Sequence, residues 1–198
     1  PSSLESFIGR ITTLRIAELP IRRVLLQVYR RGVAYFTSNH ASVAPGITRD
    51  FDPLELLSRR LSSEGIELEA WVNCNNLGSQ PDPALLNALG NDSLVHDHWG
   101  SPVSSEHPLL TPRGELSAPF SLDTPGTWID PSSIPHRERL SIIVEEISAH
   151  YPLLSGIHLD FIRYPYALPM RPGASIPCGI DLGYGPALTR FLHDEQMT

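Results

Sequence analysis

The stretch SGIHLDFIRYP, residues 155–165, places an aspartate and an arginine inside an apolar run. Charged side chains are rarely buried unless they have a partner or a function. His158 lies on the same strand face as Asp160, because side chains alternate along a strand. We interpret Asp160 as a catalytic carboxylate that the nearby Arg163 guanidinium keeps ionised. The alternative is a structural ion pair between Asp160 and Arg163 that holds the end of the strand together.

Polar or aromatic side chains also close two other apolar runs. Arg31 follows RRVLLQVYR, and Trp71 and Asn73 lie at the end of IELEAWVN. Arg31 and Asn73 could donate hydrogen bonds to a ligand or to Asp160. Trp71 is a candidate stacking surface for a ligand, and its alternative role is that of a core tryptophan.

The residues around Asp160 are candidates for the same ligand site. His158 could hydrogen-bond a ligand or tune Asp160, and the alternative is a core histidine with its polar atoms satisfied. Arg163 and Tyr164 could bind a ligand or brace the loop that follows the strand.

A group of histidines and one cysteine suggest other chemistry. His96, Asp97, His98 and His107 include an H-x-H spacing that can bind a metal. A third ligand at a recognisable interval is missing, so we interpret these residues as solvated loop residues. Cys74 follows Asn73 but has no identifiable histidine partner for a thiol nucleophile. The sequence therefore predicts neither a metal nor a cofactor.

Hydrophobic periodicity and end signals predict the elements that position these residues. In one helix Asp52 is the expected N-cap, Pro53 the first residue and Glu55 the second half of a capping box, and Gly65 ends the helix. The expected helices are 4–19, 53–64, a short helix after Asp82–Pro83, 135–150 and 184–196, and the expected strands are 24–29, 66–73 and the run that begins at 155.

The order of these elements predicts a class of fold. Strands that alternate with helices imply an α/β protein with parallel strand pairing and right-handed crossovers. Ligands bind at the carboxyl ends of the strands in such folds. The candidate residues follow three separate strands, and we therefore expect them to share one edge of the sheet. The connection 74–133 is long enough to be functional itself.

The composition limits the class of protein. The chain of 198 residues is long enough for one globular domain, and its net charge of −7 argues against nucleic-acid binding. All 15 positive side chains are arginines. Two cysteines are too few for a disulfide framework, and no apolar run is long enough to cross a membrane. The chain begins with Pro1, which is compatible with a fragment or with an export signal outside this chain.

Five segments resemble the glycosyl-hydrolase-like family 10, a bacterial family distinct from the xylanases that share its number. The most specific segment is GIHLDFIRYP, at 156–165. The others, in chain order, are VYRRGVAYFTS, EGIELEAWVN, WIDPSSIPHRERLSIIVEEI and LGYGPALTRF. Val33 departs from the family pattern, which has an acidic residue after the glycine. The turn after Asp130–Pro131 is one residue longer than the family spacing.

This resemblance implies a (β/α)₈ TIM barrel. The chain shows three clear strands, so residues 1–198 are interpreted as a single partial barrel domain with about strands two to four and their helices.

The resemblance also implies a glycoside hydrolase that acts on a bacterial cell-envelope polysaccharide, with the glycan strands of peptidoglycan as one candidate. Asp160 would be the nucleophile, and a retaining enzyme needs a second carboxylate about 5 Å away. Asp130, Glu69, Asp97 and Asp181 are available, but none fits a motif for the acid. A catalytically inactive carbohydrate-binding or scaffolding protein remains the main alternative, and a metal-dependent polysaccharide deacetylase is a third. The sugar, the linkage and the oligomeric state stay open.

Overall fold

The structure is a computed structural model of the chain. The residues that it describes are 6, 9, 10, 21–97, 99–103, 120–122, 124–169 and 182–196. Ser6, Gly9 and Arg10 are helical, and most of the helix expected at 4–19 lies outside the described residues.

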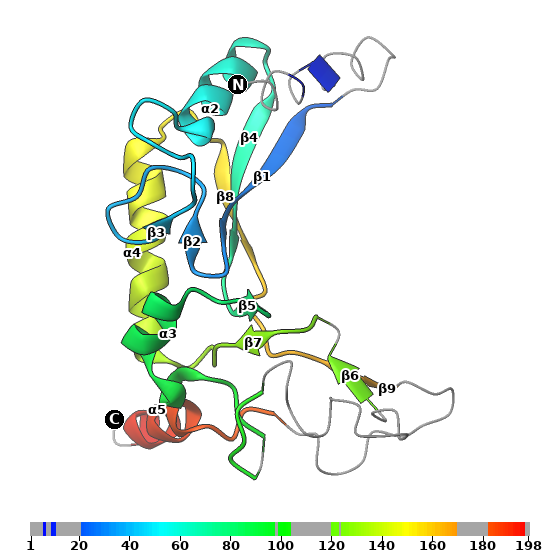
Figure 1. Cartoon of the computed structure of the whole chain (residues 1–198), viewed down its shortest axis with the longest axis vertical. Helices are drawn as coiled ribbons and strands as arrows, with labels where there is room; N and C mark the ends of the chain where they lie inside the picture. Colours follow the sequence, from blue (N-terminus) through cyan, green and yellow to red (C-terminus); the bar gives the residue numbers. More distant parts are fainter. Residues whose placement is uncertain are drawn as a thin grey trace.

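The centre of the molecule is a sheet of five strands (Figure 1). Its strands, in sheet order, are β3 (Ser42–Val43), β2 (Val33–Ala34), β1 (Arg23–Arg30), β4 (Glu67–Asn73) and β8 (Gly156–Asp160). The strands β1, β4 and β8 are parallel neighbours, and β2 returns antiparallel to β1. The three predicted strands and their parallel pairing are therefore confirmed, and the fold is a mixed α/β fold.

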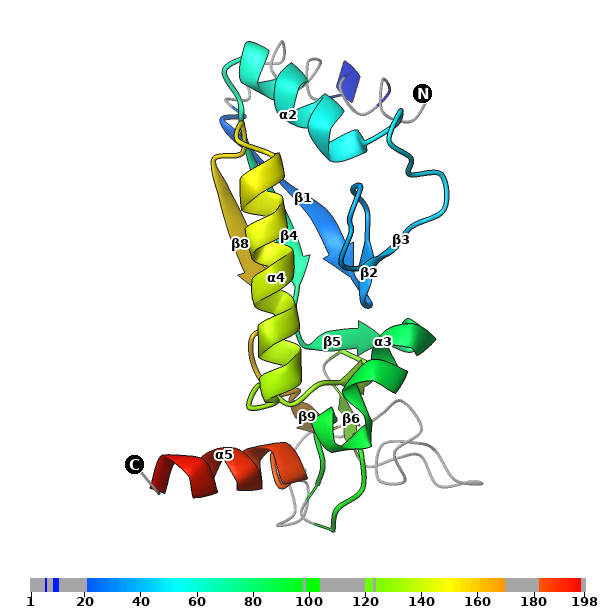
Figure 2. The same cartoon turned by 90° about the vertical axis from the view of Figure 1, so that its left-hand side faces the viewer.

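Helices cover one face of this sheet. The helices α2 (Pro53–Ser63) and α4 (Ile134–His150) follow β1 and β4 in the chain, and α4 runs along the sheet in Figure 2. Leu57 of α2 and Ile143 of α4 are buried against Val72 of β4 in one apolar core. No described helix covers the opposite face, where Leu25 is 42% exposed. The sheet thus has a covered face and an open face.

The start of α2 follows the prediction in part. The Asp52 carboxylate accepts hydrogen bonds from the backbone N–H groups of Leu54 (2.9 Å) and Glu55 (3.2 Å), as an N-cap does. Glu55 does not reach back to complete a capping box, because its carboxylate binds Arg59 one turn later. Gly65 has a φ of 67° and ends the helix as predicted.

The connection between β4 and α4 is folded at the carboxyl ends of the parallel strands. It contains β5 (Asn76–Gly78), α3 (Pro83–Leu89), a short 3₁₀ helix η1 (Asn91–Ser93), β6 (Phe120–Leu122) and β7 (Thr127–Trp128). The short helix predicted after Asp82–Pro83 is confirmed as α3, with Asp82 as its N-cap. A second apolar cluster, formed by Leu77, Leu85, Leu89 and Ile129, packs this region together.

Two further elements complete the described chain. The strand β9 (Ala167–Pro169) pairs antiparallel with β6, and the last helix is α5 (Pro186–Gln196), close to the predicted 184–196. None of the helices in the described ranges combines the length and the apolar character that a membrane crossing requires.

Candidate functional site at the carboxyl ends of the parallel strands

The carboxylate of Asp160 is held at the last position of β8 by two N–H donors. The indole Nε1 of Trp71 donates to Oδ2 at 3.1 Å, and the backbone N–H of Phe161 donates to Oδ1 at 2.7 Å. The pairing of β4 with β8 explains the first contact, because it places Trp71 opposite His158 and Asn73 opposite Asp160. Trp71 thus lies two residue pairs before Asp160 along the sheet and on the same face.

Trp71 and His158 lie on the open face of the sheet. Their rings meet edge to face, with centroids 6.2 Å apart. Trp71 is half-buried and His158 is exposed, so neither is a buried core residue. An exposed imidazole and a partly exposed indole beside a carboxylate can offer a ligand hydrogen bonds and an apolar ring surface.

The backbone turns sharply after Asp160. Phe161 has a φ of 53°, in the left-handed region that is uncommon for residues other than glycine. The carbonyls of Asp160 and Phe161 accept hydrogen bonds from the N–H groups of Cys74 (2.9 Å) and Asn75 (3.2 Å). Such a conformation costs about 1–3 kcal/mol and is found most often at functional sites. The turn ends the strand at the carboxylate and redirects the chain.

The turn also separates Arg163 from Asp160. The Arg163 guanidinium lies over the ring of Tyr166, with its central carbon 4.2 Å from the ring centroid, and over the rings of Phe161 and Trp128. Its Nη1 donates to the carbonyl of Tyr164 at 2.9 Å. The prediction that Arg163 pairs with Asp160 is therefore wrong, since Trp71 and the Phe161 N–H take that place.

Tyr164 braces the loop after β8. Its hydroxyl donates to Oδ1 of Asp130 at 2.8 Å, and the same oxygen accepts from the backbone N–H of Ser132 at 2.8 Å. Burial and the Asp130 carboxylate raise the pKa of Tyr164, so the phenol stays protonated. Of the two roles predicted for Tyr164, these contacts favour bracing.

Arg31 lies in the tight turn between β1 and β2. Arg31 and Gly32 have φ angles of 57° and 82°, as a two-residue hairpin turn with positive φ requires. The Arg31 side chain packs on Gly78, where a Cβ atom would lie 2.8 Å from Arg31 Nε. Arg31 therefore packs on the β5 region, and none of its described hydrogen bonds reaches Asp160.

Buried polar atoms without a protein hydrogen-bond partner gather at this end of the sheet. Such atoms are few in folded proteins and mark ordered water, strain or function. Among the described residues they are Tyr29 Oη, Arg31 Nε, Asn73 Oδ1, Asn76 Nδ2, Asp130 Oδ2, both ring nitrogens of His136, and Arg139 Nε. All of them belong to the ends of β1 and β4, the segments that follow, or the first turns of α4. The end that holds Asp160 is thus the polar end of the core.

His136 and Arg139 are the residues of this region that the sequence reasoning missed. His136 is 1% exposed, and burial lowers its pKa to about 4, so the ring is neutral at pH 7. Tyr29, at the end of β1, faces Arg139, and burial raises its pKa. A sequence signal did exist, because PHRER places four charged or titratable side chains in the first turns of a helix that begins at the site.

Cys74 is unsuited to act as a nucleophile. The thiol is buried, and this burial raises its pKa to about 11, so it stays protonated at neutral pH. Sγ lies 3.6 Å from the carbonyl oxygen of Val72. These features are those of a structural cysteine.

The interpretation of the histidine group as solvated loop residues is wrong for His96 and Asp97, which are 8% and 2% exposed. No three His, Cys, Asp or Glu residues in the described part of the chain are placed to hold an ion. His96 Nδ1 lies 2.7 Å from the Leu94 carbonyl, and Asp97 Oδ1 accepts from the N–H groups of Trp99 and Ser101. His98 and His107 lie outside the described residues.

Comparisons with known proteins support the type of fold but do not assign the chain to a family. No family model matches the chain, and no curated protein matches it. Among solved structures, a hypothetical protein from Ruminiclostridium thermocellum ATCC 27405 matches with a TM-score of 0.50 and 14% sequence identity. The match covers 98% of this chain and 86% of that one. At this identity the likeness supports the α/β arrangement alone.

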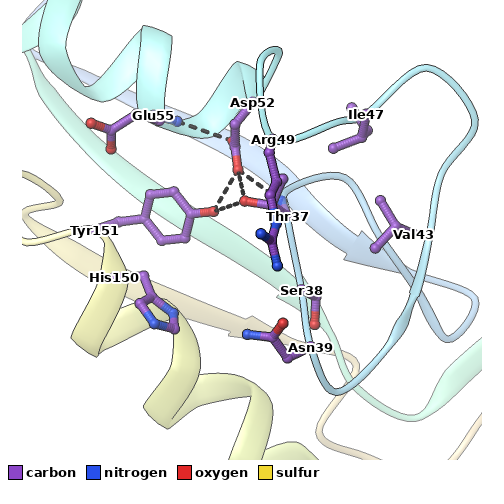
Figure 3. Close-up of a pocket in the computed structure, with 10 residues that line it drawn as sticks. All are labelled: Thr37, Ser38, Asn39, Val43, Ile47, Arg49, Asp52, Glu55, His150 and Tyr151. Carbon is purple, nitrogen blue, oxygen red and sulfur yellow. Dashed lines mark hydrogen bonds between the residues drawn. The ribbon is translucent and has the colours of Figure 1, made fainter.

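A separate cavity of about 530 Å³ lies on the helix side of the sheet (Figure 3). It is bounded by the loop after β2, the start of α2 and the end of α4. In its wall Oδ2 of Asp52 accepts from the Thr37 N–H (2.7 Å), the Thr37 hydroxyl (2.5 Å) and the Tyr151 hydroxyl (2.6 Å). These bonds tie the loop, α2 and α4 to one carboxylate, and we interpret this cluster as structural.

Proposed function

We propose that this chain is a glycoside hydrolase of the glycosyl-hydrolase-like family 10 type, acting on a bacterial cell-envelope polysaccharide such as peptidoglycan glycan strands. The observation that carries the proposal is the Asp160 carboxylate, which two N–H donors hold beside the partly exposed Trp71 at the end of a parallel strand. The resemblance of GIHLDFIRYP to the family supplies the reaction and the substrate class.

In this proposal Asp160 faces the anomeric carbon as a nucleophile or as an electrostatic stabiliser. Glycosidase transition states carry positive charge on the sugar ring, which a fixed carboxylate stabilises. The Trp71 N–H orients one carboxylate oxygen, and the indole ring offers an apolar surface to the C–H face of a sugar. His158 is exposed beside Trp71 and can hydrogen-bond a sugar hydroxyl.

We also propose that the three parallel strands are neighbours in a (β/α)₈ barrel. They follow one another in the sheet in chain order, each joined to the next through a helix on the same face. The open face would then be the inside of the barrel, and the polar carboxyl ends would be its ligand-binding rim.

Non-catalytic carbohydrate binding is the second candidate. The contacts of the other carboxylates that could have served as the acid favour it. Glu69 forms an ion pair with Arg23 at 2.9 Å. Asp130 is fully buried and Asp97 is 2% exposed, and both accept hydrogen bonds from their own turns. Asp181 lies outside the described residues. The described part of the chain thus offers Asp160 no evident acid partner.

The test compares hydrolysis of a panel of purified envelope glycans by the wild-type chain and by Asp160→Asn. We expect the substitution to lower turnover by roughly a hundredfold or more, while folding is preserved because Asn keeps the shape of the side chain. Asp50→Asn, an exposed carboxylate before α2, is the control and should keep full activity. Equal turnover by wild type and Asp160→Asn would remove Asp160 from the mechanism. Binding without hydrolysis would support the second candidate.

A further inference from the structure

A second cavity lies beside the loop after β8, at the start of α5. It measures about 450 Å³, within the usual range of small-ligand sites. Its wall is formed by His96, Gly100, Tyr184, Pro186, Thr189 and Arg190. Two segments far apart in the sequence meet here, because the N–H groups of Gly183 and Tyr184 donate to the carbonyl of His96 at 2.9 and 3.2 Å.

An exposed aromatic ring lines this cavity. Tyr184 forms part of the wall and is 54% exposed. Leaving a large aromatic ring in water is unfavourable, so an exposed ring in the wall of a cavity indicates a contact surface for a ligand.

The polar groups of the wall suit a neutral ligand. A backbone carbonyl can only accept, so His96 Nδ1 donates to Leu94, and in the neutral imidazole Nε2 is then an acceptor. Arg190 offers N–H donors, yet its charge is balanced by Asp92 at 2.8 Å. The cavity therefore combines an acceptor, a donor and aromatic surface without an unbalanced charge, which favours a polyhydroxylated ligand over an anion.

The cavity is connected to the Asp160 region through one apolar cluster. Phe161, the neighbour of Asp160, packs in that cluster with Tyr164 and Leu182. A Cβ atom added to Gly183 would lie 3.2 Å from the ring of Tyr164, so the segment before α5 lies directly against the loop after β8.

We infer that this cavity is a saccharide subsite, in which Tyr184 stacks on a sugar ring and His96 Nε2 accepts a hydrogen bond from a sugar hydroxyl. The inference rests on the proposed function for its choice of ligand, and it deepens that function by adding a subsite for a second part of a glycan chain. The histidine of the H-x-H motif then binds a ligand directly, without a metal.

The test is isothermal titration calorimetry of the full chain with N-acetylglucosamine oligomers of two and six units. We expect Tyr184→Ala to weaken binding of the longer oligomer about tenfold, as loss of an aromatic anchor does. Tyr184→Phe keeps the ring and should bind nearly as well as wild type, which separates stacking from damage to the loop. Tyr35→Ala removes a tyrosine that is 39% exposed elsewhere and should leave binding unchanged.

The outcomes separate this inference from the proposed hydrolysis. Wild-type binding that is unchanged in Tyr184→Ala overturns the subsite and leaves the role of Asp160 standing. Binding that depends on Tyr184 in a chain that hydrolyses no glycan supports the subsite and contradicts the enzyme. Failure of the wild-type chain to bind either oligomer overturns the subsite.

Discussion

At the scale of single residues, the Asp160 contact depends on strand register. Trp71 reaches Asp160 only because β4 and β8 pair with Trp71 opposite His158. Arg163 was the expected partner because it is close in sequence, but the left-handed Phe161 turns the chain and sends the guanidinium onto aromatic rings. The sequence pattern therefore singled out Asp160 but predicted the wrong partner for its carboxylate.

The buried neutral His136 leads to a prediction about pH. Its pKa is near 6.5 in the unfolded chain and about 4 in the folded one, so between these values the unfolded state binds the additional proton. The contribution of neutral His136 to the free energy of unfolding is therefore complete above about pH 6.5. It falls by about 3 kcal/mol as the pH is lowered towards 4.

Urea unfolding at a series of pH values checks this prediction. His136→Gln should flatten the pH dependence between pH 6.5 and 4, whatever its effect on stability at pH 7. The exposed His40 provides the control, and His40→Gln should keep the wild-type slope. A slope that is the same in His136→Gln as in wild type would contradict the assignment.

At the scale of elements, two buried carboxylates hold the loop after β2 against the helices. Asp52 binds Thr37 and Tyr151, and Glu146 of α4 accepts from the Ser38 hydroxyl at 2.5 Å and the Asn39 N–H at 2.6 Å. Burial alone would raise the pKa of Asp52, but the hydrogen bonds from Thr37 and Tyr151 outweigh it and the pKa is lowered. The stability that Asp52 contributes is thus present above its unfolded pKa and lost as the pH falls through the folded value.

Tyr151→Phe tests this carboxylate cluster. It removes the hydroxyl that donates to Asp52 at 2.6 Å and keeps the ring that packs edge to face on Phe36. A buried hydrogen bond to a charged group is worth about 1.5–3 kcal/mol, and we expect this loss in the free energy of unfolding measured with urea. Tyr35→Phe, on a 39% exposed ring, should change it by less than about 0.5 kcal/mol. Equal stability of the two variants would contradict the structural role of Tyr151.

At the scale of the whole molecule, the position of each strand in the sheet determines how easily its backbone amides become accessible to water. The β4 strand lies between β1 and β8, whereas β8 pairs with β4 alone among the described strands. The Ser155 N–H donates to the Leu68 carbonyl, so the alternation of a parallel ladder turns the His158 amide away from β4.

Hydrogen exchange followed by NMR should show this difference. We expect the β4 amides to exchange only through global unfolding, and the His158 amide to exchange through local fluctuations at a much higher rate. The Leu159 amide, which the same alternation turns towards β4, is the matched comparison within one strand. Protection of His158 equal to that of β4 would indicate that a further strand covers this edge.

Whether the sequence predicts a given element depends on how far apart in the chain the residues that determine it lie. The helices α2, α3 and α4 were predicted, because caps and apolar periodicity are local signals. The strands β2, β3, β5, β6, β7 and β9 were not, since each has only two or three residues and exists through pairing with a distant partner.

The sequence by itself determined the order of the main elements, the parallel pairing of β1, β4 and β8, and the gathering of polar residues at their carboxyl ends. The tertiary structure alone decided which side chains touch there. Trp71 meets Asp160 across two strands, Tyr164 meets Asp130 across two loops, and Tyr184 meets His96 across almost half of the chain. The physical reason is that periodicity and capping act within a few residues, while these contacts depend on the register and packing of segments that are distant in sequence.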